Sequence, residues 1–277
     1  MEQSIFSQLS MVIVIGAVIA LIMRVLRQPV IMGYIITGIL VGPSLLNIVH
    51  AKDTFQSFSE IGITLLLFII GLGMNAGVIR SLGRVSLVTA GVILLLVGSV
   101  GYLASVLMGF GHATGIILGV ALFFSSTIII LKALSDSREL TRLYGQIAIG
   151  VILVDDVVAT IALVVVGTLA GNGHISAEDF AILGLKALLL GVGLYIVSSR
   201  IMPRLGKFLA GSQELLFLFS IAWGMGIASV FHLAGFSYEV GALFAGVSLA
   251  GLPYATEMAS KLKPLRDFFI VLFFVTL

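Results

Sequence analysis

The sequence predicts an all-α polytopic membrane protein, one that crosses the bilayer many times. Of its 277 residues, 60% are hydrophobic and 10% are charged, whereas about 25% of residues in soluble domains are charged. Long apolar runs alternate with short polar loops, and a backbone in lipid satisfies its own hydrogen bonds by forming helices. The absence of Cys excludes disulfides and thiolate metal sites. Because the basic residues are spread between the apolar runs, the expected partner is the lipid bilayer, and no nucleic acid is expected.

Ten apolar runs are the expected membrane spans, since about 20 apolar residues cross a hydrocarbon core. The ten residues at the start of the chain lack the basic segment and cleavage site of a signal peptide, so the first span is expected to be retained. In chain order the runs cover residues 6–26, 29–47, 55–74, 84–107, 112–134, 143–170, 178–200, 212–232, 235–256 and 264–277.

The Lys and Arg residues alternate with these spans. Thirteen of the 15 lie in or beside the loops after the odd-numbered spans. The loops after the even-numbered spans hold only Lys52, and Lys186 lies within the seventh span. Because cytoplasmic loops are enriched in Lys and Arg, this pattern predicts a protein of the cytoplasmic (inner) membrane with its N-terminus outside.

Two parts of the chain indicate an inverted repeat. Spans 29–47 and 235–256 share a similar spacing of glycines before a proline, and the span after each contains a Leu-Phe pair. The matched spans are seven apart, so they cross the membrane in opposite directions, as inverted-topology repeats do. The matched residues are Gly33, Gly38, Gly42 and Pro43 with Gly241, Gly246, Gly251 and Pro253, and Leu67-Phe68 with Leu272-Phe273.

The repeat also predicts that the chain is the N-terminal part of a longer protein. Gly33 and Gly241 are 208 residues apart, so a partner of span 143–170 would lie near residue ~362. The last run has 14 residues, fewer than the roughly 20 of a full span. We therefore expect a truncated chain that lacks the partners of its fourth, fifth and sixth spans.

Two adjacent aspartates, Asp155 and Asp156, lie at the centre of the apolar run 143–170. Each carboxylate at that depth costs at least roughly 2.5–3.5 kcal/mol, and intramembrane carboxyls commonly mark a path for ions or protons. Two carboxyls this close cannot both ionise cheaply, so the pair is expected to titrate as a unit. The alternative is a structural pair neutralised by a base such as Lys186, whose side chain could instead extend to the interface. Glu239, at the start of span 235–256, is interpreted as an interfacial residue.

Three consecutive hydroxyl residues, Ser125, Ser126 and Thr127, lie near the middle of span 112–134. They cannot all face one side of a regular helix. Either they bond back to carbonyls of the preceding turn, or the helix is interrupted there, as at many intramembrane ion sites. Because they lie at the depth of the aspartates, we expect an interruption that supports a cation site.

Six stretches, in order along the chain, resemble the monovalent cation:proton antiporter-2 family of Kef-type and sodium/proton exchangers. The resemblance implies thirteen helices in two inverted repeats, a homodimer, and a core with two crossed interrupted helices, the last three helices lying beyond Leu277. The stretches are QPVIMGYIITGILVGP (28–43), EIGITLLLFIIGL (60–72), SSTIIILKALSD (125–136), GVILVDDVVA (150–159), VGALFAGVSLAG (240–251) and PLRDFFIVLFFV (264–275).

The resemblance also assigns roles to the polar residues. Asp156 matches the aspartate that the family shares, and span 112–134 matches the first interrupted helix. Asp155 stands where potassium-efflux members have Gln and electrogenic sodium exchangers have Asp, which favours Na⁺ over K⁺. The implied metal ligands are Asp155 and Asp156, for a transported monovalent cation, and no cofactor is implied.

The favoured function is therefore exchange of a monovalent cation for protons by alternating access, and no enzyme activity is expected. A sodium-coupled organic-solute symporter is a second reading, which would need a larger polar cavity. An ion channel would need a filter of carbonyls or charges, and no such loop is present in the sequence. A non-transporting truncated fragment is the remaining alternative.

The charge pattern makes a prediction about topology. Single cysteines at Arg138 and Lys261 should be protected from an impermeant thiol reagent on intact cells, whereas a cysteine at His174 should react, because the chain has no other Cys. Labelling at position 138 without labelling at position 174 would reverse the assigned orientation.

Overall fold

The computed structural model describes residues 4–276 except 44, 75, 171–176 and 210. The described residues form helices and no strand, which confirms the all-α prediction. Seven of the described helical stretches are long and apolar enough to cross a membrane, judged by length and composition. His174, which the topology prediction uses, lies outside the described residues.

The helices follow the predicted spans closely in most places. The run 143–170 is a single helix with those bounds, whereas the run 112–134 is divided into two helices. In chain order the elements are α1 (Ile5–Val25), α2 (Val30–Val41), α3 (Lys52–Leu72), α4 (Ala76–Leu107), α5 (His112–Phe123), α6 (Thr127–Asp136), α7 (Leu143–Ala170), α8 (Ala177–Ile196), the π-helical turn η1 (Val197–Ile201), α9 (Met202–Leu209), α10 (Gln213–Leu233), α11 (Tyr238–Leu249) and α12 (Ala255–Thr276).

Five boundaries differ from the prediction by more than five residues. Helix α4 begins at Ala76 instead of residue 84, the helical segment from α8 continues to Leu209 instead of residue 200, and α12 begins at Ala255 instead of residue 264. Helix α2 ends at Val41 instead of residue 47, and α11 ends at Leu249 instead of residue 256. The start of α12 shows the cause: it carries charged Glu257 and Lys261, but it buries Met258 and Leu262 completely. Apolar runs mark the segment suited to lipid, while packing extends the helix beyond it.

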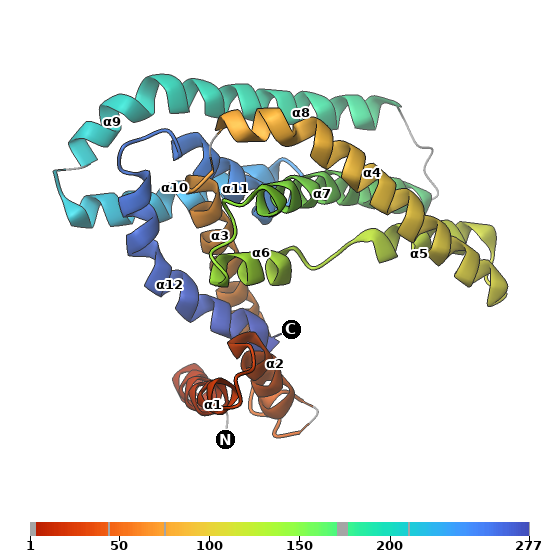
Figure 1. Ribbon diagram of the computed structural model, residues 1–277, viewed down its shortest axis with the longest axis horizontal. Helices are drawn as coiled ribbons and strands as arrows, with labels where there is room; N and C mark the ends of the chain where they lie inside the picture. The colour runs from red at the N-terminus through yellow and green to blue at the C-terminus, as the bar shows by residue number, and fades with distance from the viewer. Residues whose placement is uncertain (1–3, 44, 75, 171–176, 210, 277) are drawn as a thin grey trace.

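The helices drawn in Figure 1 fall into two groups by their contacts. In the first, which we call the four-helix unit, α4 packs against α5 and α7, and α6 packs against α7. In the second, which we call the α3 bundle, α3 contacts α10, α11 and α12. Helix α12 also contacts α2, which contacts α1. Helix α8 contacts α11, and α9 contacts α10. Every extensive pairing of helices in the described chain lies within one of these two groups.

Helix α3 is the centre of its bundle. Leu65, Leu66 and Phe68 are fully buried in it. Helix α11 crosses α3 so closely that a Cβ added to Gly246 would lie 2.8 Å from the Cα of Gly71. Small residues permit this approach, on which helix association in a membrane depends.

A second close crossing joins α2 to α12. A Cβ added to Gly38 would lie 3.0 Å from the carbonyl carbon of Val275. Gly38 and Gly246 occupy corresponding positions in the proposed repeat, and each meets the long helix of the other half. The inverted repeat itself stays a prediction.

The α3–α11 crossing predicts that Gly246→Ala lowers the free energy of unfolding in detergent by about 1–3 kcal/mol, because the added methyl forces two backbones apart. The matched control is Gly226→Ala on α10, where an added Cβ meets nothing within 4 Å. The control should be neutral or stabilising, since Ala favours a helix over Gly by roughly 0.5–1 kcal/mol. Equal stability of the two variants would contradict the close packing.

Candidate cation and proton site

The predicted interruption of the fifth span is present. Helix α5 ends at Phe123 and α6 begins at Thr127. Between them, Phe124 and Ser126 have extended backbone, with ψ angles of 116° and 98°. Helix termini leave backbone carbonyl and N–H groups without helical partners, so this break supplies polar groups within an apolar segment.

The three hydroxyls at the break are not used by the protein. In the described part of the chain, the side chains of Ser125, Ser126 and Thr127 have no hydrogen-bond partner, and Ser126 caps α6 without a side-chain bond. Elsewhere the hydroxyls do bond back, as Ser59 does to the Phe55 carbonyl and Ser220 to the Leu216 carbonyl. The back-bonded alternative is therefore wrong for these three residues, and their oxygens are available to a ligand.

The two aspartates lie on the unbroken helix α7. Asp155 is only 7% exposed, and its Oδ1 atom has no hydrogen-bond partner. Asp156 is partly buried, and its backbone carbonyl accepts a hydrogen bond of 2.9 Å from the hydroxyl of Thr160. Since an unpaired polar group costs free energy when it is buried, the Asp155 carboxyl is the strongest indication of a ligand or proton site.

The aspartate pair faces the boundary between the two groups of helices. Ile149 and Ile152, on the turns before Asp156, share a hydrophobic cluster with residues of α3, α11 and α12. Residues four apart lie on the same side of a helix, so Asp156 continues the face that begins with Ile152. Its position suits a site whose access changes when the two groups move relative to each other.

The structure adds one residue that the sequence analysis missed. Glu239, in the first turn of α11, lies near enough to Asp156 for the two carboxylates to repel each other when both are ionised, and the neighbouring Tyr238 packs on the cluster that contains Ile152. Glu239 lies at the start of α11, as it does near the start of the run 235–256, so the interfacial interpretation stays a prediction. No signal in the sequence alone points to its closeness to Asp156, which depends on how α7 and α11 are placed.

Other predicted contacts are not formed. No hydrogen bond or ion pair in the described chain joins the aspartates to Ser125, Ser126 or Thr127. Lys186 is exposed on α8 and pairs with neither aspartate. Among the described residues, no three His, Asp or Glu side chains gather closely enough to hold a metal ion. The candidate site thus consists of a carboxyl pair and a helix break within one four-helix unit.

Comparison with known proteins identifies the family of the chain. The family model of the transmembrane sodium/hydrogen exchanger matches residues 11–277. The chain belongs to this family. The resemblance to Kef-type antiporters is thereby confirmed, since the similar proteins include several cation/proton and potassium efflux antiporters.

Three relatives illustrate the range of the match. The YbaL protein of Escherichia coli K12, named as a candidate cation/proton antiporter, is 29% identical over 95% of this chain and 49% of its own length. The K(+) efflux antiporter 5 of Arabidopsis thaliana is 26% identical over 97% of this chain and 48% of its own. The iron transporter MagA of Paramagnetospirillum magneticum is 27% identical over 91% of this chain and 58% of its own length. The chain therefore spans about half the length of the curated relatives it matches.

The free hydroxyls at the break lead to a stability prediction. The double substitution Ser125→Ala with Ser126→Ala should change the free energy of unfolding by less than about 0.5 kcal/mol, because no protein hydrogen bond is lost. Ser220→Ala is the comparison: it removes a buried hydroxyl that donates to the Leu216 carbonyl at 2.6 Å, which should cost about 1 kcal/mol. Denaturation of the purified protein in one detergent measures both. A loss in the double variant as large as in Ser220→Ala would assign the hydroxyls a structural role.

Proposed function

We propose that this chain is the membrane part of an antiporter that exchanges a monovalent cation for protons by alternating access. The observation that carries the proposal is the buried carboxyl of Asp155, with an unpartnered oxygen, beside Asp156 in a member of the sodium/hydrogen exchanger family. A carboxyl in lipid is neutral when it holds a proton and needs a counter-charge when it does not. The same oxygens can therefore hold a proton or a cation, but not both cheaply.

The chemistry needs only groups that the site supplies. Asp156 binds the cation and a proton in turn, and Asp155 adds a second group that releases a proton. The hydroxyls and open backbone groups at residues 124–127 supply neutral oxygen ligands. These replace part of the water shell that the cation loses on leaving solution.

Sodium is the favoured cation and potassium the second candidate. The aspartate at position 155, where the resemblance places Gln in potassium-efflux members, supports Na⁺. The names of two relatives, K(+) efflux antiporters 5 and 6 of Arabidopsis thaliana, support K⁺. Competition between the two ions in a transport assay decides between them.

We favour exchange over the symporter reading because the family model that matches residues 11–277 is that of the sodium/hydrogen exchanger.

The roles of the two aspartates predict different effects in membrane vesicles that contain the full-length native protein. Asp156→Asn should abolish cation-dependent proton movement, because the shared ligand is lost. Asp155→Asn should retain exchange but reduce the charge moved per cycle, since two carboxyls release two protons for each cation and one releases one. The control is Asp53→Asn, an exposed aspartate in the first turn of α3, which should exchange normally.

An imposed membrane potential separates these cases. One net charge in a potential of about 100 mV corresponds to roughly 2.3 kcal/mol, or a roughly 50-fold change in the cation gradient at equilibrium. The unsubstituted protein should show this shift and Asp155→Asn should show little of it. Equal responses would refute the role of Asp155, and exchange by Asp156→Asn would refute the site.

A further inference from the structure

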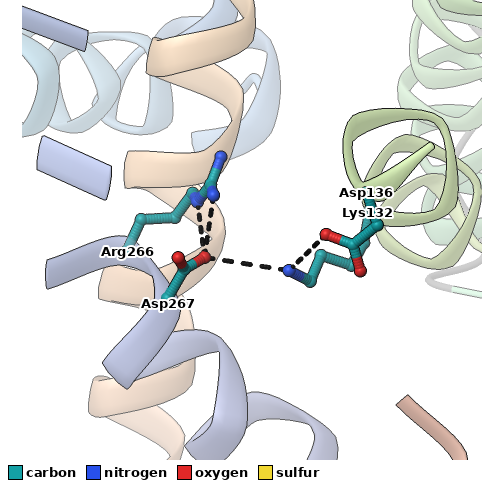
Figure 2. A network of polar contacts seen from close by, with 4 residues as sticks. All are labelled: Lys132, Asp136, Arg266 and Asp267. Atoms are coloured by element: carbon teal, nitrogen blue, oxygen red, sulfur yellow. Dashed lines mark hydrogen bonds and ion pairs between the residues drawn. The ribbon is translucent and has the colours of Figure 1, made fainter. Parts of the chain in front are cut away.

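A network of four charged residues joins α6 to α12 (Figure 2). The ammonium Nζ of Lys132, on α6, lies 2.7 Å from Asp136 Oδ1 and 3.7 Å from Asp267 Oδ1 on α12. Arg266 donates to the same Asp267 oxygen, from Nη2 at 2.8 Å and from Nε at 3.0 Å. Within the described residues, Lys132–Asp267 is the only ion pair that joins two helices, since the others lie within α6 or within α12.

This ion pair crosses from the four-helix unit to the α3 bundle, which share no extensive pairing of helices. It also borders a cavity of about 270 Å³ between α2, α6 and α12. Tyr34 of α2 lines that cavity together with Asp136 and Asp267. The remaining lining residues are Val30, Ile31, Lys132 and Ile270. The two groups are thus joined by charges beside an open space at this point.

Both charges keep a partner when the pair separates. Lys132 retains Asp136 at 2.7 Å, and Asp267 retains Arg266 at 2.8 Å. The side chain of Asp267 is 53% exposed, so its carboxylate also has water. Breaking a buried pair by removing one partner is costly because it leaves an uncompensated charge, and here the separation leaves none.

We propose that Lys132 and Asp267 form a reversible latch, which holds the four-helix unit against the α3 bundle and narrows access to the cavity between α2, α6 and α12. The latch opens when the unit moves to admit a cation, so the inference rests on the proposed alternating access. By the loop charges, the latch is on the face predicted to be cytoplasmic. Asp136 is the competing partner that draws Lys132 back to its own helix and sets how tightly the latch holds.

Because Asp136 and Asp267 compete for Lys132, replacing each aspartate by asparagine should change the opening of the cavity in opposite directions. Asp267→Asn removes the partner across the boundary and should open the cavity more often. Asp136→Asn removes the competitor and should leave Lys132 to Asp267, so that the cavity opens less often. Lys132→Gln removes the cation from both and should act like Asp267→Asn.

The test uses the absence of Cys from the chain. A single cysteine is placed at Ile31, which lines the cavity and is partly buried, in the full-length protein purified in detergent. Its rate of reaction with an uncharged hydrophilic maleimide reports opening, and an uncharged reagent is not attracted or repelled by the altered charges. A cysteine at Leu107, 86% exposed on α4, is the control and should react at one rate in every variant.

We expect Asp267→Asn and Lys132→Gln to raise the rate at position 31 by about two- to fivefold, the range of a partly exposed ion pair. Asp136→Asn should lower the rate by a similar factor, and should have no effect when Asp267→Asn is already present. Equal rates in all variants would overturn the latch, as would a rise with Asp136→Asn. The labelling experiment requires no transported cation, so a negative labelling result would overturn the latch and leave the antiport proposal standing. Conversely, exchange by Asp156→Asn would refute the antiport site without changing the labelling result.

Discussion

A buried carboxyl group without a protein partner is the constraint on which the rest of this structure depends. Three charged side chains are buried in the described chain: Lys132, Asp155 and Arg266. Lys132 and Arg266 are each paired with a carboxylate, whereas the Oδ1 atom of Asp155 has no partner. The protein thus satisfies its structural charges and leaves one acidic group unmatched at the centre of α7. A proton or a cation could supply the partner that this carboxyl lacks, and this is the physical basis of the proposal that the site holds a proton and a cation in turn.

Two kinds of packing surround this group. Around α3, glycines bring backbones so close that a methyl group does not fit, as at Gly246 and Gly71. Such packing gives one arrangement and resists deformation. Between the α3 bundle and the four-helix unit no pairing of helices is extensive, and the contact is made by side chains. It consists of a hydrophobic cluster that includes Leu131, Ile149 and Ile152, and of the Lys132–Asp267 ion pair beside a cavity. The boundary between the two groups therefore depends on side-chain packing, whereas the glycine crossings fix the shape of the α3 bundle.

Sequence patterns predicted the features that depend on residues close together in the chain. The interruption at residues 124–126 was predictable because three adjacent hydroxyls cannot share one helical face, and α7 was predictable because its apolar run has clear ends. The early start of α12 was not, since residues 255–263 are held in a helix by the burial of Met258 and Leu262 and not by a continuous apolar run. The interaction of Glu239 with Asp156 and the pairing of Lys132 with Asp267 join residues far apart in the chain. Neither leaves a pattern in a single sequence, because each depends on how separate helices cross.

Helix α6 connects the two polar regions of the four-helix unit. It has 10 residues, and at about 1.5 Å per residue it is a rod of roughly 15 Å. Thr127, at its first position, belongs to the helix break, and Lys132, about one and a half turns later, contacts Asp267. Because α6 is short, the proposed mechanism treats it as one rigid piece, in which a cation that displaced its first turn would also displace Lys132. Lys132 keeps Asp136 on the same helix when it leaves Asp267, so that displacement would leave no unpaired charge. The proposed cation site and the proposed latch would therefore be coupled through α6.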